Sequence, residues 1–198
     1  MSYDLNVSKL AKFKGKTIFL FDSSTFCRYE ELSLYSGIDF FEVVGKLDRI
    51  VFLLTNEVIV ELMNGPRKFH PKFLLDHIIN VDGSMDHSLK ENRFLYEKEG
   101  KPHYLVLNKV SAVDWNQVLL CQNHSDLVLV TNDRKLLKSS KVILGDRSFG
   151  AASLIYKLLE MYPDNTELQS LEIKSKELFK HEKLGGTTTI SDQQWARR

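Results

Sequence analysis

The sequence predicts an α/β fold built on a parallel sheet, and three observations lead to that prediction. Short, continuous apolar runs are typical of strands that are buried on both faces, as the strands of parallel sheets are. Segments with a helical spacing of apolar residues separate these runs, and this alternation is expected of a parallel sheet covered by helices. The chain has 198 residues, which suits one domain with a sizeable core.

The expected strands are short apolar segments spread along the chain. "IFLF" at residues 18–21 and "IVFLL" at 50–54 are the clearest, because neither contains a polar residue. Less extensive apolar runs predict the others. In chain order, the five strand candidates are 16–21, 49–55, 103–108, 126–131 and 141–145.

Helices are expected between these strands. Ser111 is a suitable N-cap for the helix that follows it. A second helix has a polar cap at Thr55 or Asn56 and ends at the Gly-Pro pair of residues 65–66. The polar segment 82–102 is expected to form a helix and a loop. The other helix candidates, together with these two, are 29–49, 55–65, 70–81, 111–124, 148–162 and 164–184.

Composition and charge favour a cytoplasmic protein. The net charge of +1 argues against a protein that coats nucleic acid, but not against one that holds RNA in a local groove. The first residues lack the apolar core of a signal peptide, and no apolar run can span a bilayer, so no membrane association is expected. Cys27 and Cys121 lie in apolar contexts without metal-ligand spacing, so we expect free thiols in a reducing compartment.

Four acidic residues lie in or near the loops and helices expected at the functional edge of a parallel sheet. Asp22 leaves the first strand and Asp133 leaves the fourth, while Glu61 and Asp114 lie on helices next to strands. Ligands of such sheets bind beyond the carboxyl ends of the strands. Four clustered carboxylates would repel one another unless a cation neutralised them. Hard oxygen ligands suit Mg²⁺ or Mn²⁺, so the set predicts a site for one of these ions.

Each acid also has a simpler interpretation when it is taken alone. Asp133 is then most simply a helix N-cap, and Asp114 a negative charge that stabilises a helix dipole. Glu61 is then a residue of a solvated helix face, where Glu57 competes with it for any functional role. Asp22 is harder to explain in this way, because it follows an apolar strand at the edge of the core. The prediction of a site therefore depends on the whole set.

Three segments of the chain resemble the PIN-domain family of nucleases. "IFLFDSSTF" resembles the family's opening strand, which ends in an Asp, and "NEVIVEL" resembles its helix with a Glu. "SAVDWNQVLLCQNHSDLVLVTNDRKLL" resembles its last motif, in which an Asp heads a helix and a strand ends in Thr-Asn-Asp. The spacing of 19 residues between Asp114 and Asp133 is typical of this motif. The resemblance covers about residues 16–145.

The resemblance implies a three-layer α/β/α fold with a central parallel sheet of four to five strands. It also implies a divalent-metal-dependent endoribonuclease that hydrolyses RNA phosphodiester bonds with a metal-activated water. The residues that would hold Mg²⁺ or Mn²⁺ and carry catalysis are Asp22, Glu61, Asp114 and Asp133. Ser24, Thr131 and Asn132 would hold these carboxylates by hydrogen bonds.

Basic residues next to two of the acids are candidates for phosphate contacts. Arg67 and Lys68 follow the helix that carries Glu61, and Arg134 and Lys135 follow Asp133. An ordinary solvated surface explains each of these residues equally well.

The resemblance suggests a PIN-like nuclease domain over residues 1–163, with a helical insert at about 66–102. A charged helix and a flexible tail are expected over 164–198, and this helix either docks on the domain or forms an interface. The expected partners are an RNA substrate, a second copy in a homodimer, and an antitoxin or other protein. The alternative function is a non-catalytic PIN-fold module that binds RNA or protein. A phosphotransfer fold fits less well, because Ser24 stands where a phosphatase of that kind needs a second Asp.

Overall fold

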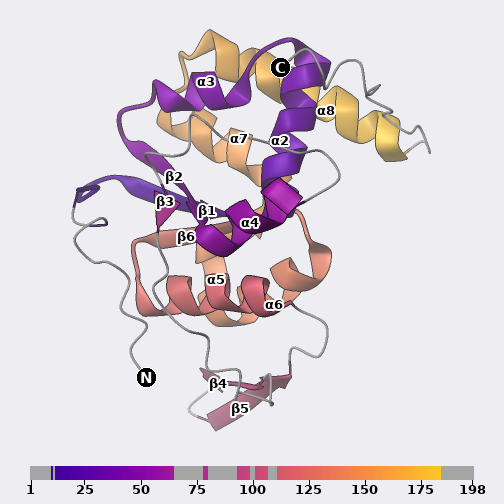
Figure 1. The fold of residues 1–198 in the computed structure, drawn as a ribbon. Coiled ribbons are helices and arrows are strands. Elements are labelled where there is room, and N and C mark those ends of the chain that lie inside the picture. Colours follow the sequence, from indigo (N-terminus) through magenta and orange to yellow (C-terminus); the bar gives the residue numbers. More distant parts are fainter. Residues whose placement is uncertain are drawn as a thin grey trace.

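The computed structural model describes residues 10, 12–64, 78–79, 93–98, 101–106 and 111–183 (Figure 1). Within them, a five-stranded sheet has the order β3-β2-β1-β6-β7, and all of its neighbouring strands are parallel. The predicted α/β class, with one parallel sheet flanked by helices, is therefore confirmed. The strands of this sheet are β1 (Thr17–Phe21), β2 (Ile50–Thr55), β3 (Ile78–Ile79), β6 (Leu127–Thr131) and β7 (Ser148–Gly150).

Helices cover both faces of the sheet (Figure 1). The helices among the described residues are α2 (Ser23–Ser36), α3 (Phe40–Gly45), α4 (Asn56–Asn64), α5 (Ala112–Asn123), α6 (Arg134–Leu144), α7 (Ala151–Met161) and α8 (Thr166–Lys183), with a short 3₁₀ turn, η2, at Gly145–Arg147. None of these helices is both long enough and apolar enough to cross a membrane.

The alternation of side chains along β1 divides the core into two layers. Phe19 and Phe21 point to one face, where α2, α3, α4, α7 and α8 pack. Ile18 and Leu20 point to the other face, where α5 and α6 pack. Both faces of the strand are therefore apolar, which explains why its sequence is a continuous apolar run instead of an alternating one.

The direction of winding reverses between β1 and β6, the two central neighbours. From β1 the chain passes α2 and α3 on one face to reach β2. It reaches β6 and β7 through α5 and α6 on the opposite face. The register pairs Phe21 with Val130, so Asp22 and Thr131 stand side by side at the carboxyl edge. This is the position at which open α/β sheets bind their ligands.

The prediction of a strand at 141–145 is wrong, because this segment is the last part of α6. Its Val-Ile-Leu run continues a helical stripe in which Leu136, Ser140 and Leu144 are buried at intervals of four residues. The edge strand β7 instead lies at Ser148–Gly150, within a segment that we expected to be wholly helical. A run of three apolar residues could not separate the two periods.

Three further segments differ from the predictions. The helix expected over 29–49 is two helices, because Gly37 ends α2 with a left-handed φ of 73° and Asp39 caps α3. Residues 78–79, expected to be helical, form β3 beside β2. The helix expected within 82–102 is also wrong for residues 93–98, which form β4 (Arg93–Lys98) and pair antiparallel with β5 (Lys101–Val106).

The C-terminal helix docks on the domain. In α8, Leu168, Leu171 and Leu178 are buried in the same cluster as residues of α2 and α7. Of the two roles expected for this charged helix, the described part therefore fulfils the first. Its apolar stripe is thin because the opposite face stays in solvent.

Tyr29 gives a test of the packing between α2 and α7. Its buried ring stacks on Phe40, with ring centroids 3.9 Å apart, and its hydroxyl donates to the Ala151 carbonyl oxygen at 2.5 Å. We predict that Tyr29→Phe lowers the free energy of unfolding by about 1 kcal/mol, because it removes one hydrogen bond and keeps the ring. Denaturant unfolding measures this. Tyr35→Phe, on the exposed side of the same helix, is the control, and an equal loss there would contradict the assignment.

Candidate active site

Asp22 is the most firmly held acid at the carboxyl edge of the sheet. It is 2% exposed and is the N-cap of α2. Its Oδ1 accepts a hydrogen bond from the Thr25 N–H at 2.7 Å. Its Oδ2 accepts bonds from the Ser24 hydroxyl at 2.7 Å and from the Thr131 hydroxyl at 2.5 Å. The predicted roles of Ser24 and Thr131 as holders of a carboxylate thus agree with the geometry.

The Thr-Asn-Asp turn after β6 is tied to Asp22 through Thr131. The Asp133 N–H donates to the same Thr131 hydroxyl oxygen at 3.0 Å. On the neighbouring strand end, the Thr25 hydroxyl donates to the Val130 carbonyl oxygen at 3.0 Å. The start of α2 and the end of β6 are therefore joined by side-chain bonds in addition to the sheet. Asn132 is exposed, and its side chain makes no hydrogen bond to a carboxylate within the described residues.

Asp133 is the N-cap of α6, as the simpler interpretation predicted. Its Oδ1 accepts hydrogen bonds from the Lys135 N–H at 2.6 Å and from the Leu136 N–H at 3.1 Å. The residue is exposed. Capping occupies one carboxylate oxygen and leaves the second available to a ligand.

Asp114 lies in the first turn of α5. Its N–H donates to the hydroxyl oxygen of Ser111, the N-cap, at 3.1 Å. Partial burial is the largest cause of the raised pKa of Asp114, and the negative charges of Asp22 and Asp133 raise it further. Hydrogen bonds with Ser111 oppose these effects. The charged form of Asp114 is thus less favourable here than in an unfolded chain.

Glu61 caps no helix, yet it lies within the same electrostatic environment. It is an exposed residue of the last turns of α4. Burial of part of its carboxyl group is the largest cause of its raised pKa, and the charges of Asp114, Asp22 and Glu57 act in the same direction. A hydrogen bond from Ser23 lowers it. Glu61 therefore lies within reach of the charges of Asp22 and Asp114. We call the four acids Asp22, Glu61, Asp114 and Asp133 the acid cluster.

The four predicted acids come to one edge of the sheet and act on one another's charge. The negative charge of Asp22 raises the pKa of both Glu61 and Asp114, and that of Asp133 raises the pKa of Asp114. Nevertheless, within the described residues no three Asp, Glu, His or Cys side chains lie close enough together to hold a metal ion. The donor set suits Mg²⁺ or Mn²⁺ chemically. Asp22 is buried and accepts three hydrogen bonds, whereas Glu61 and Asp133 are exposed and Asp133 uses only Oδ1 in its cap.

Two buried amides beside Asp114 were missed from the sequence. Asn116 is 4% exposed and Gln117 is fully buried, and neither amide has a hydrogen-bond partner within the described part of the chain. One carboxylate oxygen of Glu57 is also buried without a partner among these residues. Most buried polar atoms in proteins are paired, so these three need a reason. An adjacent Asn and Gln within a largely apolar helix was the signal in the sequence.

The predicted phosphate contacts are described only in part. Arg67 and Lys68 lie outside the described residues. Arg134 and Lys135 are exposed in the first turn of α6, immediately after Asp133.

The raised pKa of Asp114 predicts a specific dependence of stability on pH. The folded state binds the proton of the Asp114 carboxyl group more tightly than the unfolded state does. Ionised Asp114 therefore destabilises the fold once the pH rises above the usual pKa of an aspartate. Asp114→Asn should therefore gain stability relative to the natural protein as pH rises, and lose this advantage as pH falls through the pKa. Unfolding free energies between about pH 4 and pH 8 measure it. An advantage that grows toward low pH would contradict the prediction.

Gln117 gives a second test. We predict that Gln117→Leu raises the free energy of unfolding by about 1–2 kcal/mol, because it removes a buried amide that has no partner. Gln122→Leu, at an exposed position of the same helix, is the matched control and should change stability by less than about 0.5 kcal/mol. A destabilised Gln117→Leu protein would show that the amide is satisfied.

Comparisons with known proteins assign the chain to no family. No protein-family profile, no curated protein and no solved structure matches it. Any function of the chain therefore has to be inferred from the residues of the site.

Proposed function

We propose that this protein is a divalent-metal-dependent endoribonuclease whose site is the acid cluster of Asp22, Glu61, Asp114 and Asp133. One observation carries the proposal. Asp22 is a buried carboxylate that Ser24 and Thr131 hold by hydrogen bonds at the switch point between β1 and β6. Its negative charge raises the pKa of Glu61 and Asp114, and the charge of Asp133 also raises the pKa of Asp114. Structural roles account for single members of this set, but not for the presence of all four acids at one edge of the sheet.

Capping alone does not require the arrangement. A Ser or Thr caps a helix as well as an Asp does, so α2 needs no buried charge at its N-terminus. Burying a carboxylate is costly even when it is hydrogen-bonded. Glu61 caps no helix and yet lies where three other carboxylates raise its pKa. Clusters of perturbed acids at a strand edge are a feature of functional sites.

The chemistry follows from the donor set. A bound Mg²⁺ or Mn²⁺ would supply charge neutralisation and activation of a water for attack on phosphorus. The protein's own part is to hold the cation with the four acids and to keep Asp22 in one orientation through Thr131. Arg134 and Lys135, next to Asp133, would attract the neighbouring phosphates of the substrate. RNA is the proposed substrate because the PIN-domain nucleases that the motifs resemble act mostly on RNA.

A second candidate, a non-catalytic RNA-binding or protein-binding module, has one observation in its favour. Asp22 and Asp133 are helix N-caps, Asp114 lies in a capped first turn, and no three acids of the described residues converge on one point. In this case the acids would be structural, and mild changes to them would leave RNA binding intact.

Asp133→Asn separates the two candidates. Asn caps helices about as well as Asp, so the fold should survive. If Asp133 is a metal ligand, the change should lower the rate at which a mixed RNA is cleaved in Mn²⁺ at least 100-fold. Loss of a residue that only hydrogen-bonds to a ligand typically costs roughly 10–100-fold. Gel analysis of the RNA measures the rate.

Asp39→Asn is the matched control. Asp39 caps α3 through the same kind of bonds, from the Phe41 N–H at 2.9 Å and the Glu42 N–H at 3.3 Å. Its variant should cut RNA at the natural rate. Equal activity of both variants would overturn the catalytic proposal. Thermal unfolding adds a second readout, since Mn²⁺ should stabilise the Asp39→Asn protein and not the Asp133→Asn protein.

A further inference from the structure

One face of α6 carries four exposed cations. Arg134, Lys135, Lys138 and Lys141 are all exposed. At 3.6 residues per turn they fall within about 120° of the helix circumference. The opposite side is the buried stripe of Leu136, Ser140 and Leu144. We call these four cations the α6 basic face.

The α6 basic face has no internal counter-charge. The sequence of α6 contains no Asp or Glu, and none of its four cations forms an ion pair within the described residues. By contrast, five other cations in or at the ends of the described helices have partners. Arg28, Lys46, Lys174 and Lys176 pair with Glu31, Glu42, Glu177 and Glu172, three or four positions away, and Lys157 lies over the Phe149 ring.

The first two cations also stand where a helix disfavours them. Arg134 and Lys135 lie in the first turn of α6, at the positive end of its dipole, and this turn contains no acid. Such a position is unfavourable for a cation. Residues that oppose a local preference of this kind, without a contact that compensates for it, are expected at functional sites. These two unfavourably placed cations follow Asp133 directly and so lie beside the acid cluster.

We propose that the α6 basic face binds the phosphate backbone of single-stranded RNA as it leaves the acid cluster. This inference rests on the proposed function, because the face begins one residue after Asp133. From Arg134 to Lys141 the helix rises by about 10 Å, roughly the span of three stacked nucleotides of one strand. One narrow row of cations matches one strand, whereas a duplex presents two.

The α6 basic face is expected to recognise the charge of the RNA backbone and not the sequence of its bases. Lysine ammonium groups bind phosphates as point charges, and α6 contains no aromatic residue to stack on a base. The binding is therefore expected to depend strongly on salt and weakly on the order of bases. Specificity in cleavage would have to arise nearer to the acids.

The test uses a triple variant, Lys135→Glu, Lys138→Glu, Lys141→Glu, and a fluorescent single-stranded RNA of mixed sequence. Fluorescence anisotropy in EDTA, where a metal-dependent nuclease cannot cut, should show affinity lower by roughly tenfold or more. The slope of log affinity against log salt should become shallower by about 2, because three phosphate contacts are lost. A variant with the natural affinity and slope would overturn the proposal.

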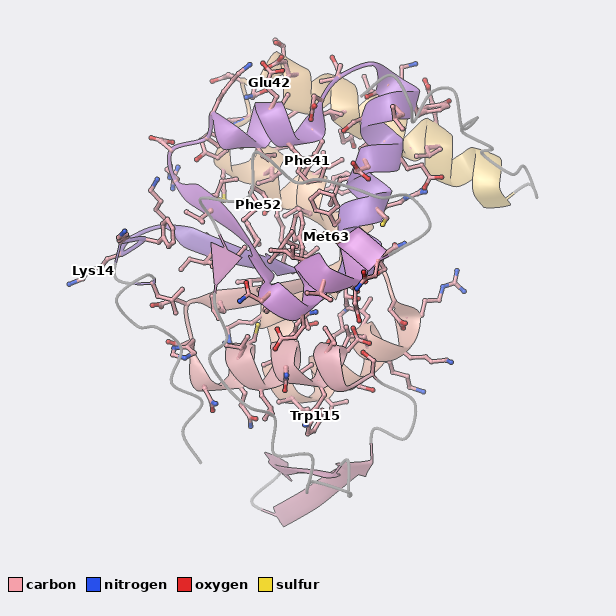
Figure 2. All side chains as sticks on the ribbon, viewed as in Figure 1. Lys14, Phe41, Glu42, Phe52, Met63 and Trp115 are labelled. Atoms are coloured by element: carbon pink, nitrogen blue, oxygen red, sulfur yellow. The ribbon has the colours of Figure 1, made fainter. Side chains whose placement is uncertain are left out.

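The control carries the same change of charge at the opposite end of the sheet. Lys12, Lys14 and Lys16 are exposed just before β1, and Figure 2 shows Lys14 beside the start of that strand. Their triple Glu variant should keep the natural affinity and slope. Equal losses in both variants would mean a general charge effect and would overturn the proposal. RNA binding that needs the α6 basic face in a protein that never cuts would uphold the face and reject the nuclease.

Discussion

The hydrogen bond from Thr131 to Asp22 is the contact on which the site depends. It joins the ends of β1 and β6, the central pair of the sheet, at 2.5 Å. Because Asp22 also caps α2, the same carboxylate fixes the start of a helix, the ends of two strands and, through Thr131, the turn that contains Asp133. A buried charge held this way has one orientation.

Helix N-termini explain how the cluster is tolerated. Asp22 and Asp133 cap α2 and α6, and Asp114 lies in the first turn of α5. Each dipole places positive charge next to a carboxylate and offsets part of the repulsion among them. Asp114 and Glu61 nevertheless keep raised pKa values, first because both are partly buried and second because neighbouring carboxylates repel their charged forms. Burial and repulsion, together with the amides of Asn116 and Gln117, which have no partner within the described residues, lower the stability of this part of the fold.

Buried strands and capped helices were the parts of the fold that the sequence predicted well. β1, β2 and β6 are long apolar runs, and α5 begins at Ser111 as its cap indicated. Residues 141–145 failed because Val, Ile and Leu in succession fit either period, and only packing against the sheet shows which holds. Asp22 and Asp133 were found by their places after strands, and Glu61 and Asp114 by their places on helices next to strands. Their mutual distances depend on side-chain rotamers and capping bonds, which no spacing encodes.

Capping and cation binding are therefore not alternatives for Asp133. The cap uses only Oδ1, through the N–H groups of Lys135 and Leu136. The second oxygen accepts no hydrogen bond within the described residues, and the next residues of the chain are the cations Arg134 and Lys135. A carboxylate needed only for capping would be better followed by neutral or acidic residues, since Arg134 and Lys135 oppose the helix dipole. Under the proposed function these cations would lie beside the phosphates of the substrate. That role would account for the sequence Asp133-Arg134-Lys135, which the stability of the helix does not favour.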